Sequence, residues 1–374
     1  MKVFLKISSV LIAIALIVDI VASFYFYNLA IARTKKDFLT QNTTLKQAVP
    51  ASAEVATAAK FSMSTEVATV VEFSANTDNS AVAEFSANTD ADAVEEFSDN
   101  TETSAVAEFS ANTGLETQID WFNKHTYEEV GIISDDGLKL KGYYLNAKIP
   151  TSKTVILAHG YSSQGTFMGS YAKLYNEELG YNVLLPDDRG HGDSEGNYTG
   201  FGWLDRKDYL KWIEFVVNKL GPNSQIILHG VSMGGATVLM TSGEKLPVNV
   251  KAIVSDCAYT SVKDELEYQL KEMYNLPPFP ILSTTSILTK LRAGYFFGEA
   301  SALEQVKKTK TPILFIHGAA DKFVPSYMVN HLYVACNSEK DLLVVPNAGH
   351  GAAYNTDPKG YKNKVSEFIG KYLK

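Results

Sequence analysis

The sequence predicts an α/β fold for residues 117–374, with a mostly parallel sheet that carries helices on both faces. Short apolar runs typical of buried strands alternate with amphipathic stretches typical of helices. Strands that are apolar throughout indicate a parallel sheet, because helices cover both of its faces. The motifs described below directly follow these runs, at the end of the strands where such sheets place their functional residues.

A hairpin is expected at the start of this region. Residues 127–133 and 138–145 have strand character and flank Asp135-Asp136-Gly137, which is a turn signal. Residues 204–220 have the apolar spacing of an amphipathic helix. The remaining strands are expected at residues 154–158, 182–186, 225–228, 250–255, 312–316 and 342–345.

The N-terminal segment, residues 1–33, is expected to contact a membrane. Residues 7–31 are almost wholly apolar and long enough to cross a bilayer as a helix, with Asp19 as an interruption. Basic residues flank both ends, so charge does not fix the orientation. Small residues at 21–23 and 30–32 leave a cleaved signal peptide open. The aromatic run at residues 24–27 favours an uncleaved single-pass anchor in the cell membrane. Either alternative places the rest of the chain outside the cytoplasm, and cleavage would make the protein secreted.

Residues 34–116 are expected to form an acidic, low-complexity spacer. The hexapeptide EFSANT begins at residues 72, 84 and 108, and EFSDNT begins at residue 96, which gives a repeat of twelve residues. Each copy has too few apolar residues to cover a core. A disordered spacer is therefore expected, and a role in surface adhesion is the alternative.

The composition argues against several kinds of partner. The chain has 34 basic and 42 acidic residues, a net charge of −8 and no basic stripe, which argues against nucleic acid. Its two cysteines, Cys257 and Cys336, belong to no CxxC pair and are expected to be buried thiols. No histidine or carboxylate cluster has metal-ligand spacing, so neither a metal nor a cofactor is expected.

The segment Gly230-Val231-Ser232-Met233-Gly234 marks Ser232 as the candidate nucleophile. It follows an expected strand and precedes an expected helix, which is the strand–turn–helix context of a nucleophile elbow. The glycines let strand and helix approach closely around a strained serine. The start of the helix also places partial positive charge beneath the serine.

Two backbone amides are candidate oxyanion donors. His159-Gly160-Tyr161 follows the strand at 154–158, and the glycine allows a turn that aims the Tyr161 N–H at a substrate carbonyl oxygen. The Met233 N–H would be the second donor, and each is worth roughly 3–4 kcal/mol in the transition state. His159 itself is interpreted as a structural residue that orients this loop.

Asp321 and His350 complete the candidate triad. Each follows an expected strand, and the chain order Ser232, Asp321, His350 is the order that a nucleophile elbow of this type requires. A serine needs a histidine to take its proton, and the histidine needs an acid to hold its tautomer. Asp256, at the end of residues 250–255, is the reserve candidate for the acid. His229 and His317 are interpreted as interior residues.

Residues 260–310 interrupt the alternating pattern. Two stretches with helical spacing flank Pro277-Pro278-Phe279-Pro280. An insertion between two strands near their C-terminal ends predicts a small helical cap with an apolar pocket over the nucleophile, and helices packed on the sheet are the alternative.

From about Asp120 to Lys374 the chain resembles bacterial α/β-hydrolases of the serine aminopeptidase and prolyl-oligopeptidase-like group. The resemblance rests on the segments that contain Tyr161, Ser232, Asp321 and His350, and on residues 188–194. It implies the α/β-hydrolase fold, a triad of Ser232, Asp321 and His350, and oxyanion donation from the Tyr161 and Met233 amides.

These residues predict a serine hydrolase, with an extracytoplasmic carboxylic-ester hydrolase as the first hypothesis. Its substrate would be a small-molecule ester that forms an acyl-enzyme. A peptidase or amidase with the same triad is the alternative, because the triad also cleaves amides. A surface-adhesion protein with a secondary hydrolase domain is the third hypothesis.

Overall fold

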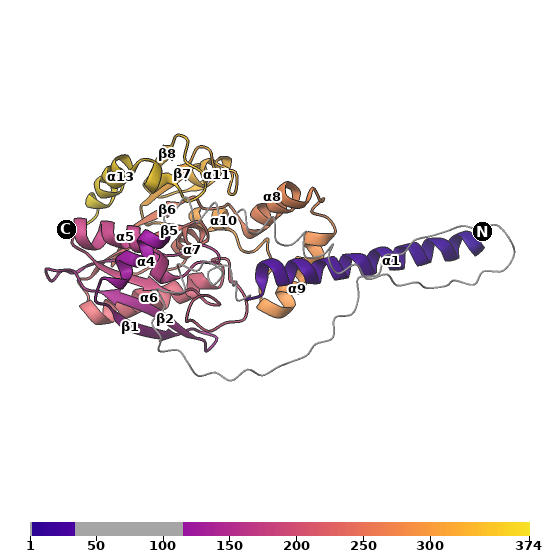
Figure 1. Cartoon of the computed structure of the whole chain (residues 1–374), viewed down its shortest axis with the longest axis horizontal. Coiled ribbons are helices and arrows are strands. Elements are labelled where there is room, and N and C mark those ends of the chain that lie inside the picture. The colour runs from indigo at the N-terminus through magenta and orange to yellow at the C-terminus, as the bar shows by residue number, and fades with distance from the viewer. Residues whose placement is uncertain (1, 34–114) are drawn as a thin grey trace. The chain divides into compact units, whose positions relative to one another are not determined.

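The computed structural model describes residues 2–33 and 115–374, which belong to one compact unit (Figure 1). The expected repeat spacer, and with it the adhesion hypothesis, falls almost entirely outside these residues. The strands are β1 (Glu128–Ile133), β2 (Lys139–Leu145), β3 (Lys153–Ala158), β4 (Asn182–Pro186), β5 (Gln225–Val231), β6 (Val250–Asp256), β7 (Ile313–Gly318) and β8 (Lys340–Val345). The helices of four or more residues are α1 (Lys2–Phe26), η1 (Tyr27–Ile31), α4 (Leu115–Asn123), α5 (Gly169–Lys173), η4 (Leu174–Glu178), α6 (Asp205–Leu220), α7 (Met233–Ser242), α8 (Val262–Tyr274), α9 (Ile281–Ala293), α10 (Ala302–Val306), α11 (Tyr327–Ala335), α12 (Ala353–Thr356) and α13 (Pro358–Gly370).

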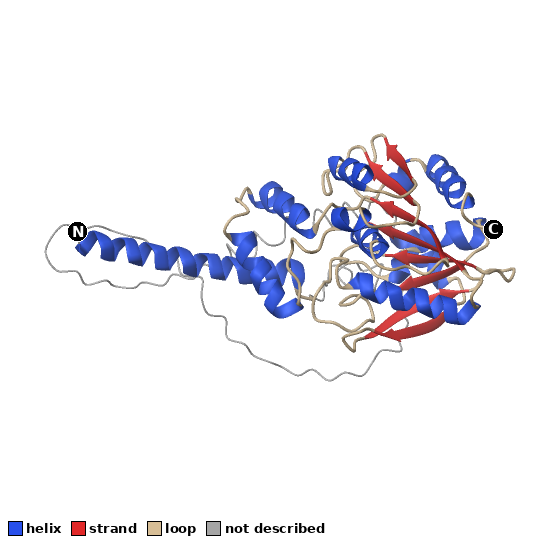
Figure 2. Cartoon of the chain, turned by 180° about the vertical axis from the view of Figure 1, so that it is seen from behind, coloured by secondary structure: helices blue, strands red, loops and turns tan. Residues whose placement is uncertain are grey.

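The strands form one eight-stranded sheet in the order β1-β2-β4-β3-β5-β6-β7-β8 (Figure 2). β1 and β2 form the expected hairpin, and β2 pairs antiparallel with β4. All other neighbours are parallel, which confirms the predicted fold class. Because β3 and β5 to β8 run in one direction, the loops that follow them meet at one edge of the sheet.

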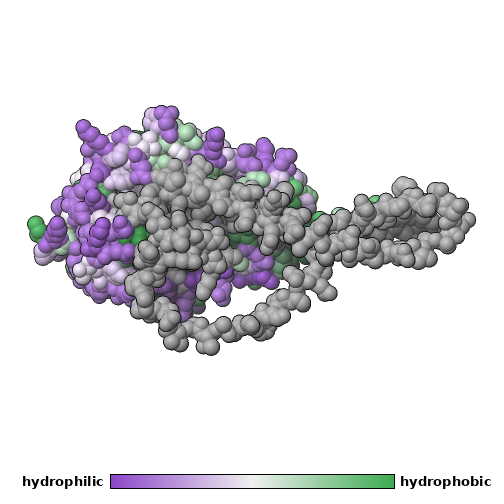
Figure 3. Space-filling model, viewed as in Figure 1, coloured by the Kyte–Doolittle hydropathy of each residue, from purple (hydrophilic) through white to green (hydrophobic). Residues whose placement is uncertain are grey.

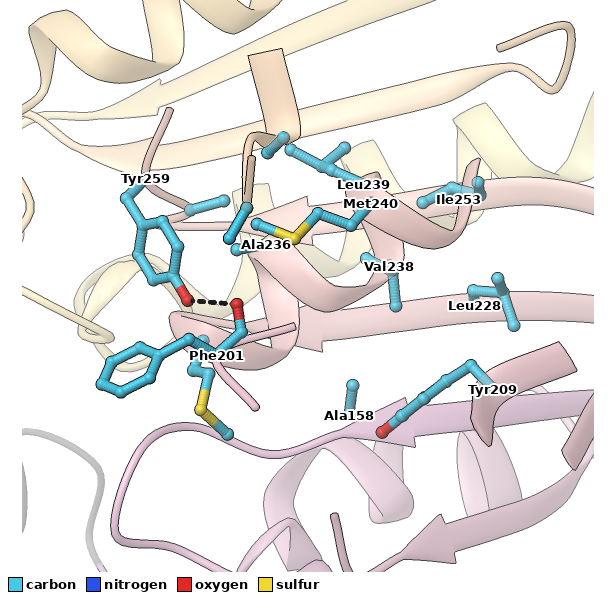
Figure 4. Close-up of a cluster of buried hydrophobic side chains, with 14 of the residues drawn as sticks. Ala158, Phe201, Tyr209, Leu228, Ala236, Val238, Leu239, Met240, Ile253 and Tyr259 are labelled. Carbon is cyan, nitrogen blue, oxygen red and sulfur yellow. Dashed lines mark hydrogen bonds between the residues drawn. The ribbon is translucent and has the colours of Figure 1, made fainter. Parts of the chain in front are cut away.

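Hydrophobic layers cover both faces of the sheet, as the apolar strands predict. One layer packs α6, α7 and α11 on the sheet, and the other packs α4, α5 and α13 on the opposite face. In the first layer, Ala236 and Leu239 of α7 lie over Leu228 of β5 and Ile253 of β6 (Figure 4). This packing fixes α7, and therefore the start of α7, relative to the sheet.

The apolar N-terminal segment forms a helix, but its last turn, η1, packs into the core of the α/β part. Ile31 is fully buried, and its carbonyl accepts from the Thr199 amide at 2.7 Å. The Arg33 guanidinium donates to the Ser194 carbonyl at 2.7 Å. The expected anchor over residues 1–33 and the expected catalytic domain therefore share a core.

Replacing Ile31 by Ala should lower the free energy of unfolding by about 2–5 kcal/mol, because it leaves a cavity in a packed core. Ile149→Ala is the matched control, since Ile149 is 78% exposed and its loss should change stability by no more than about 0.5 kcal/mol. Urea unfolding of the full chain in detergent measures both. Equal stabilities of the two variants would contradict the packing of η1 into the core.

Candidate active site

The structure joins Ser232, His350 and Asp321 in one chain of hydrogen bonds. The Ser232 hydroxyl oxygen lies 2.8 Å from Nε2 of His350. Nδ1 of His350 lies 2.8 Å from Oδ2 of Asp321. Because a carboxylate only accepts, Nδ1 carries the ring proton in the neutral imidazole and Nε2 accepts from the serine. The ring is therefore placed to take the proton of the hydroxyl.

The position of Ser232 follows from the turn between β5 and α7. Ser232 has φ +58° and ψ −118°, a strained combination that is rare for a residue with a side chain. Its amide donates to the Asp256 carbonyl at 2.9 Å, which ties the turn to β6. A Cβ atom at Gly230 would collide with the Gly234 carbonyl, and one at Gly234 would collide with the Ala158 carbonyl. The two glycines are needed for this close approach.

Four hydrogen bonds surround the Asp321 carboxylate, which lies in the loop after β7. Oδ1 accepts from the Phe323 and Val324 amides, both at 2.9 Å. Oδ2 accepts from His350 and lies 3.2 Å from Nε2 of His317. Burial disfavours the charged form, but the charge of His350 and the hydrogen bonds from both histidines outweigh it and lower the pKa of Asp321. Asp321 is therefore held ionised.

His317 is a contact of the candidate acid that the sequence interpretation missed. It was expected to be an interior strand residue, and it is fully buried in β7. The same Nε2 also lies 2.8 Å from the Val324 carbonyl, so one ring nitrogen contacts the Asp321 loop at two points, the carboxylate and the Val324 backbone. The spacing of four residues between His317 and Asp321 was the signal available in the sequence.

Asp256, the reserve candidate for the acid, has a different partner. Its Oδ2 accepts from the Tyr361 hydroxyl at 3.0 Å. Burial raises its pKa to about 6, and the Tyr361 hydrogen bond opposes that shift only in part. The Asp321 carboxylate, not that of Asp256, is the one bonded to Nδ1 of His350.

The two candidate oxyanion donors follow neighbouring strands of the sheet, β3 and β5. Ala158 at the end of β3 pairs with Gly230 of β5, and Tyr161 and Met233 each follow three residues later. Met233 begins α7, so its N–H is one of the first-turn amides without an acceptor within the helix. The loops that carry both amides therefore start side by side.

His159 holds the loop that carries Tyr161. Its Nε2 accepts from the Asp188 amide at 3.0 Å, and its Nδ1 lies 2.8 Å from the Gly160 carbonyl. Burial lowers the pKa of His159, so the ring stays neutral and can both accept and donate. The ring thereby connects the loops after β3 and β4.

Among the described residues, Cys257, Asp321 and His350 form a group whose ligand atoms lie close enough for a metal ion. The Asp321 and His350 atoms of this group are already hydrogen-bonded to each other. Burial raises the pKa of the Cys257 thiol well above its ordinary value, so it keeps its proton, whereas a metal binds the thiolate. A protonated thiol beside a hydrogen-bonded pair of Asp321 and His350 fits proton transfer better than metal binding.

Helix α8, which lies between β6 and β7 in the chain, is bound to the loop that carries Asp321. The Tyr268 hydroxyl donates to the Lys322 carbonyl at 2.8 Å, and the Gln269 side chain donates to the Phe323 carbonyl at 2.7 Å. The Phe323 ring lies 5.0 Å from the His350 ring, measured between centroids. The insertion that contains α8 and α9 therefore borders the candidate site.

Comparisons with known proteins identify a family, related sequences and related structures. The model of the prolyl oligopeptidase family matches residues 166–374. The chain is 32% identical to YqkD of Bacillus subtilis over 233 residues, which cover 62% of this chain and 76% of that protein. It is 24% identical to the membrane protein YNL320W of Saccharomyces cerevisiae, over 65% of this chain and 79% of that protein. In structure it resembles the esterase Pf2001 of Pyrococcus furiosus, with a TM-score of 0.53 and 24% identity over 67% of this chain and 94% of that chain.

Proposed function

The chain belongs to the prolyl oligopeptidase family and is a serine hydrolase of the α/β-hydrolase fold, and from this premise we propose that it hydrolyses carboxylic esters. Ser232 is the nucleophile, His350 the general base and Asp321 the acid that holds the imidazole. The Tyr161 and Met233 amides form the oxyanion hole. The continuous hydrogen bonding from Ser232 through His350 to Asp321 is the observation that carries this proposal.

The proposed reaction has two steps that use the same groups. The Ser232 oxygen attacks the ester carbonyl while His350 takes its proton, and the resulting oxyanion accepts from the Tyr161 and Met233 amides. His350 then gives that proton to the departing alcohol, and an acyl-Ser232 ester remains. In the second step His350 activates a water, which releases the carboxylic acid and restores Ser232.

The proposed location is the cell membrane, with α1 as an uncleaved single span and the catalytic part outside the cytoplasm. The segment Leu11–Ile31 has a mean hydropathy of 1.9 and the length of a membrane span. A yeast relative is described as a membrane protein. Cleavage after residue 23 or 32 would remove part or all of the helix that packs on α9, so these contacts favour an uncleaved segment.

Peptide or amide hydrolysis is the second candidate function, and the family match favours it. Members of a prolyl oligopeptidase family would act on amides, and the same three groups can protonate a leaving amine as well as an alcohol. The geometry of the triad is common to both reactions, so only the substrate can separate them.

The full chain in detergent should hydrolyse p-nitrophenyl esters and show little activity on aminoacyl-p-nitroanilides. The esters release p-nitrophenol and the anilides release p-nitroaniline, so absorbance follows both reactions. The values of kcat/KM for esters from acetate to laurate also give the length of acyl group that the site accepts. Comparable or faster anilide cleavage would establish the peptidase alternative. No turnover of either class would overturn both candidates.

A further inference from the structure

One face of α1 packs against α9 before α1 reaches the α/β part (Figures 1 and 2). From residue 19 to residue 27, the side chains that are at least partly buried recur with helical spacing: Asp19, Ala22, Ser23, Phe26 and Tyr27. The Thr284 hydroxyl of α9 donates to Oδ2 of Asp19 at 2.6 Å. Residues 11–18 are exposed all around the helix. Within residues 11–26, the described structure therefore covers α1 only from Asp19 onwards.

The uncharged stretch of α1 before Asp19 is too short to cross a bilayer alone. The uncharged stretch that precedes Asp19, residues 7–18, is about 18 Å long at 1.5 Å per residue. The hydrocarbon layer is about 30 Å thick, so roughly eight further residues of α1 must lie within it. Those residues, 19–26, are the ones that pack on α9. If α1 spans the membrane, α9 enters the same layer.

The surface of α9 and of the loop before it suits that environment. Residues 273–289 contain no charged side chain. Phe279 in the loop is 75% exposed and Ile287 of α9 is 53% exposed, although both are large and apolar. In Figure 3, most of the α/β surface that is visible carries hydrophilic side chains. An apolar surface continuous with a membrane helix indicates a lipid partner.

Charged groups return where α9 approaches the end of α1. The Arg292 guanidinium lies 5.0 Å from the centre of the Phe24 ring and 5.2 Å from the centre of the Tyr27 ring. Arginine and tyrosine are residues that favour the headgroup region. The N-terminal half of α9, which contacts Asp19 and Ser23, is therefore the deeper half.

We propose that α9 and the loop at residues 275–280 lie in the bilayer leaflet next to the catalytic part, with lipid as their partner. This surface, here called the lipid face, rests on the proposed membrane location of α1. The Tyr161 hydroxyl donates to the Ala30 carbonyl at 3.0 Å, so the candidate oxyanion loop is bound to the end of the same helix. With the lipid face in the leaflet, the candidate active site lies at the membrane surface.

The lipid face is tested with a spin label on one introduced cysteine at a time, in the full chain reconstituted in phosphatidylcholine vesicles. Phe279→Cys and Ile287→Cys are the test positions, and Val248→Cys, at an 85% exposed residue, is the aqueous control. The native Cys257 and Cys336 are buried, which protects them from labelling. The measurement compares collisions with oxygen, which enters lipid, and with a water-soluble nickel chelate.

Labels at Phe279 and Ile287 should collide with the chelate several-fold less than the label at Val248 and should stay accessible to oxygen. Val18→Cys, on the exposed part of α1, tests the membrane location separately. If the chelate reaches the labels at Phe279 and Ile287 but not the label at Val18, the lipid face would be overturned and the span would stand. Chelate access at Val18 would overturn the span and the lipid face with it. Shielding of Phe279 and Ile287 from both reagents would indicate a second protein copy and would overturn the lipid partner.

Discussion

Ser232→Ala should lower kcat for p-nitrophenyl butyrate by about 10⁴-fold or more, the scale on which a triad nucleophile acts. The variant keeps the turn between β5 and α7 but has no hydroxyl for His350 to deprotonate. The measurement is initial rate against substrate concentration for the full chain in detergent. KM should change far less than kcat, because the lost interaction belongs to the chemical step.

Ser242→Ala is the matched control for this experiment. Ser242 ends the helix that begins after Ser232, and it is also buried, where its hydroxyl donates to the Leu239 carbonyl at 2.7 Å. Its loss removes one local hydrogen bond, so stability should fall by about 1 kcal/mol with kcat retained. Full activity of Ser232→Ala would mean that another group is the nucleophile.

The alternation of apolar runs with amphipathic stretches was enough to predict the sheet. The predicted strands differ from the observed ones only at their ends. The expected strand at 225–228 continues to Val231 in the structure, because Gly230 and Val231 pair with Ser255 and Asp256 of β6. Glycines in a strand weaken the hydrophobic pattern, and only the neighbouring strand shows that the pairing continues. Boundaries of this kind depend on partners far away in the sequence.

The packing of residues 19–33 could not be predicted from the pattern. An apolar segment of membrane length looks the same whether lipid or protein surrounds its last turns. Ile31 is buried because the loop at Thr199 packs on it, and Ser23 is buried because α9 packs on it. The partners lie more than 150 residues away in the chain, where local periodicity carries no information about them.

The candidate site was predictable because parallel strands bring their C-terminal ends to one edge. A motif after β5, an aspartate after β7 and a histidine after β8 had to lie near one another. The choice between Asp321 and Asp256 was harder, because Asp256 ends β6 and Asp321 follows β7, which is the neighbouring strand. The structure places Nδ1 of His350 against Asp321, which favours Asp321, and a sequence does not contain the direction of that ring.

Asp321→Asn should lower kcat by about 10⁴-fold, because an amide no longer holds His350 in the tautomer that accepts the serine proton. The Asn side chain can still accept from the Phe323 and Val324 amides, so the loop should keep its conformation. The lost negative charge also removes the group that stabilises the imidazolium formed during attack. Kinetics of the same ester with the full chain measure the effect.

Asp256→Asn separates this role from a general effect of buried charge. Asp256 is as deeply buried as Asp321, but its oxygen accepts from Tyr361 and burial already raises its pKa to about 6. An amide oxygen can accept the same hydrogen bond, so the variant should keep most of its kcat. A loss as large as that of Asp321→Asn would make Asp256 a second essential carboxylate, whereas an active Asp321→Asn with an inactive Asp256→Asn would transfer the role of the acid to Asp256.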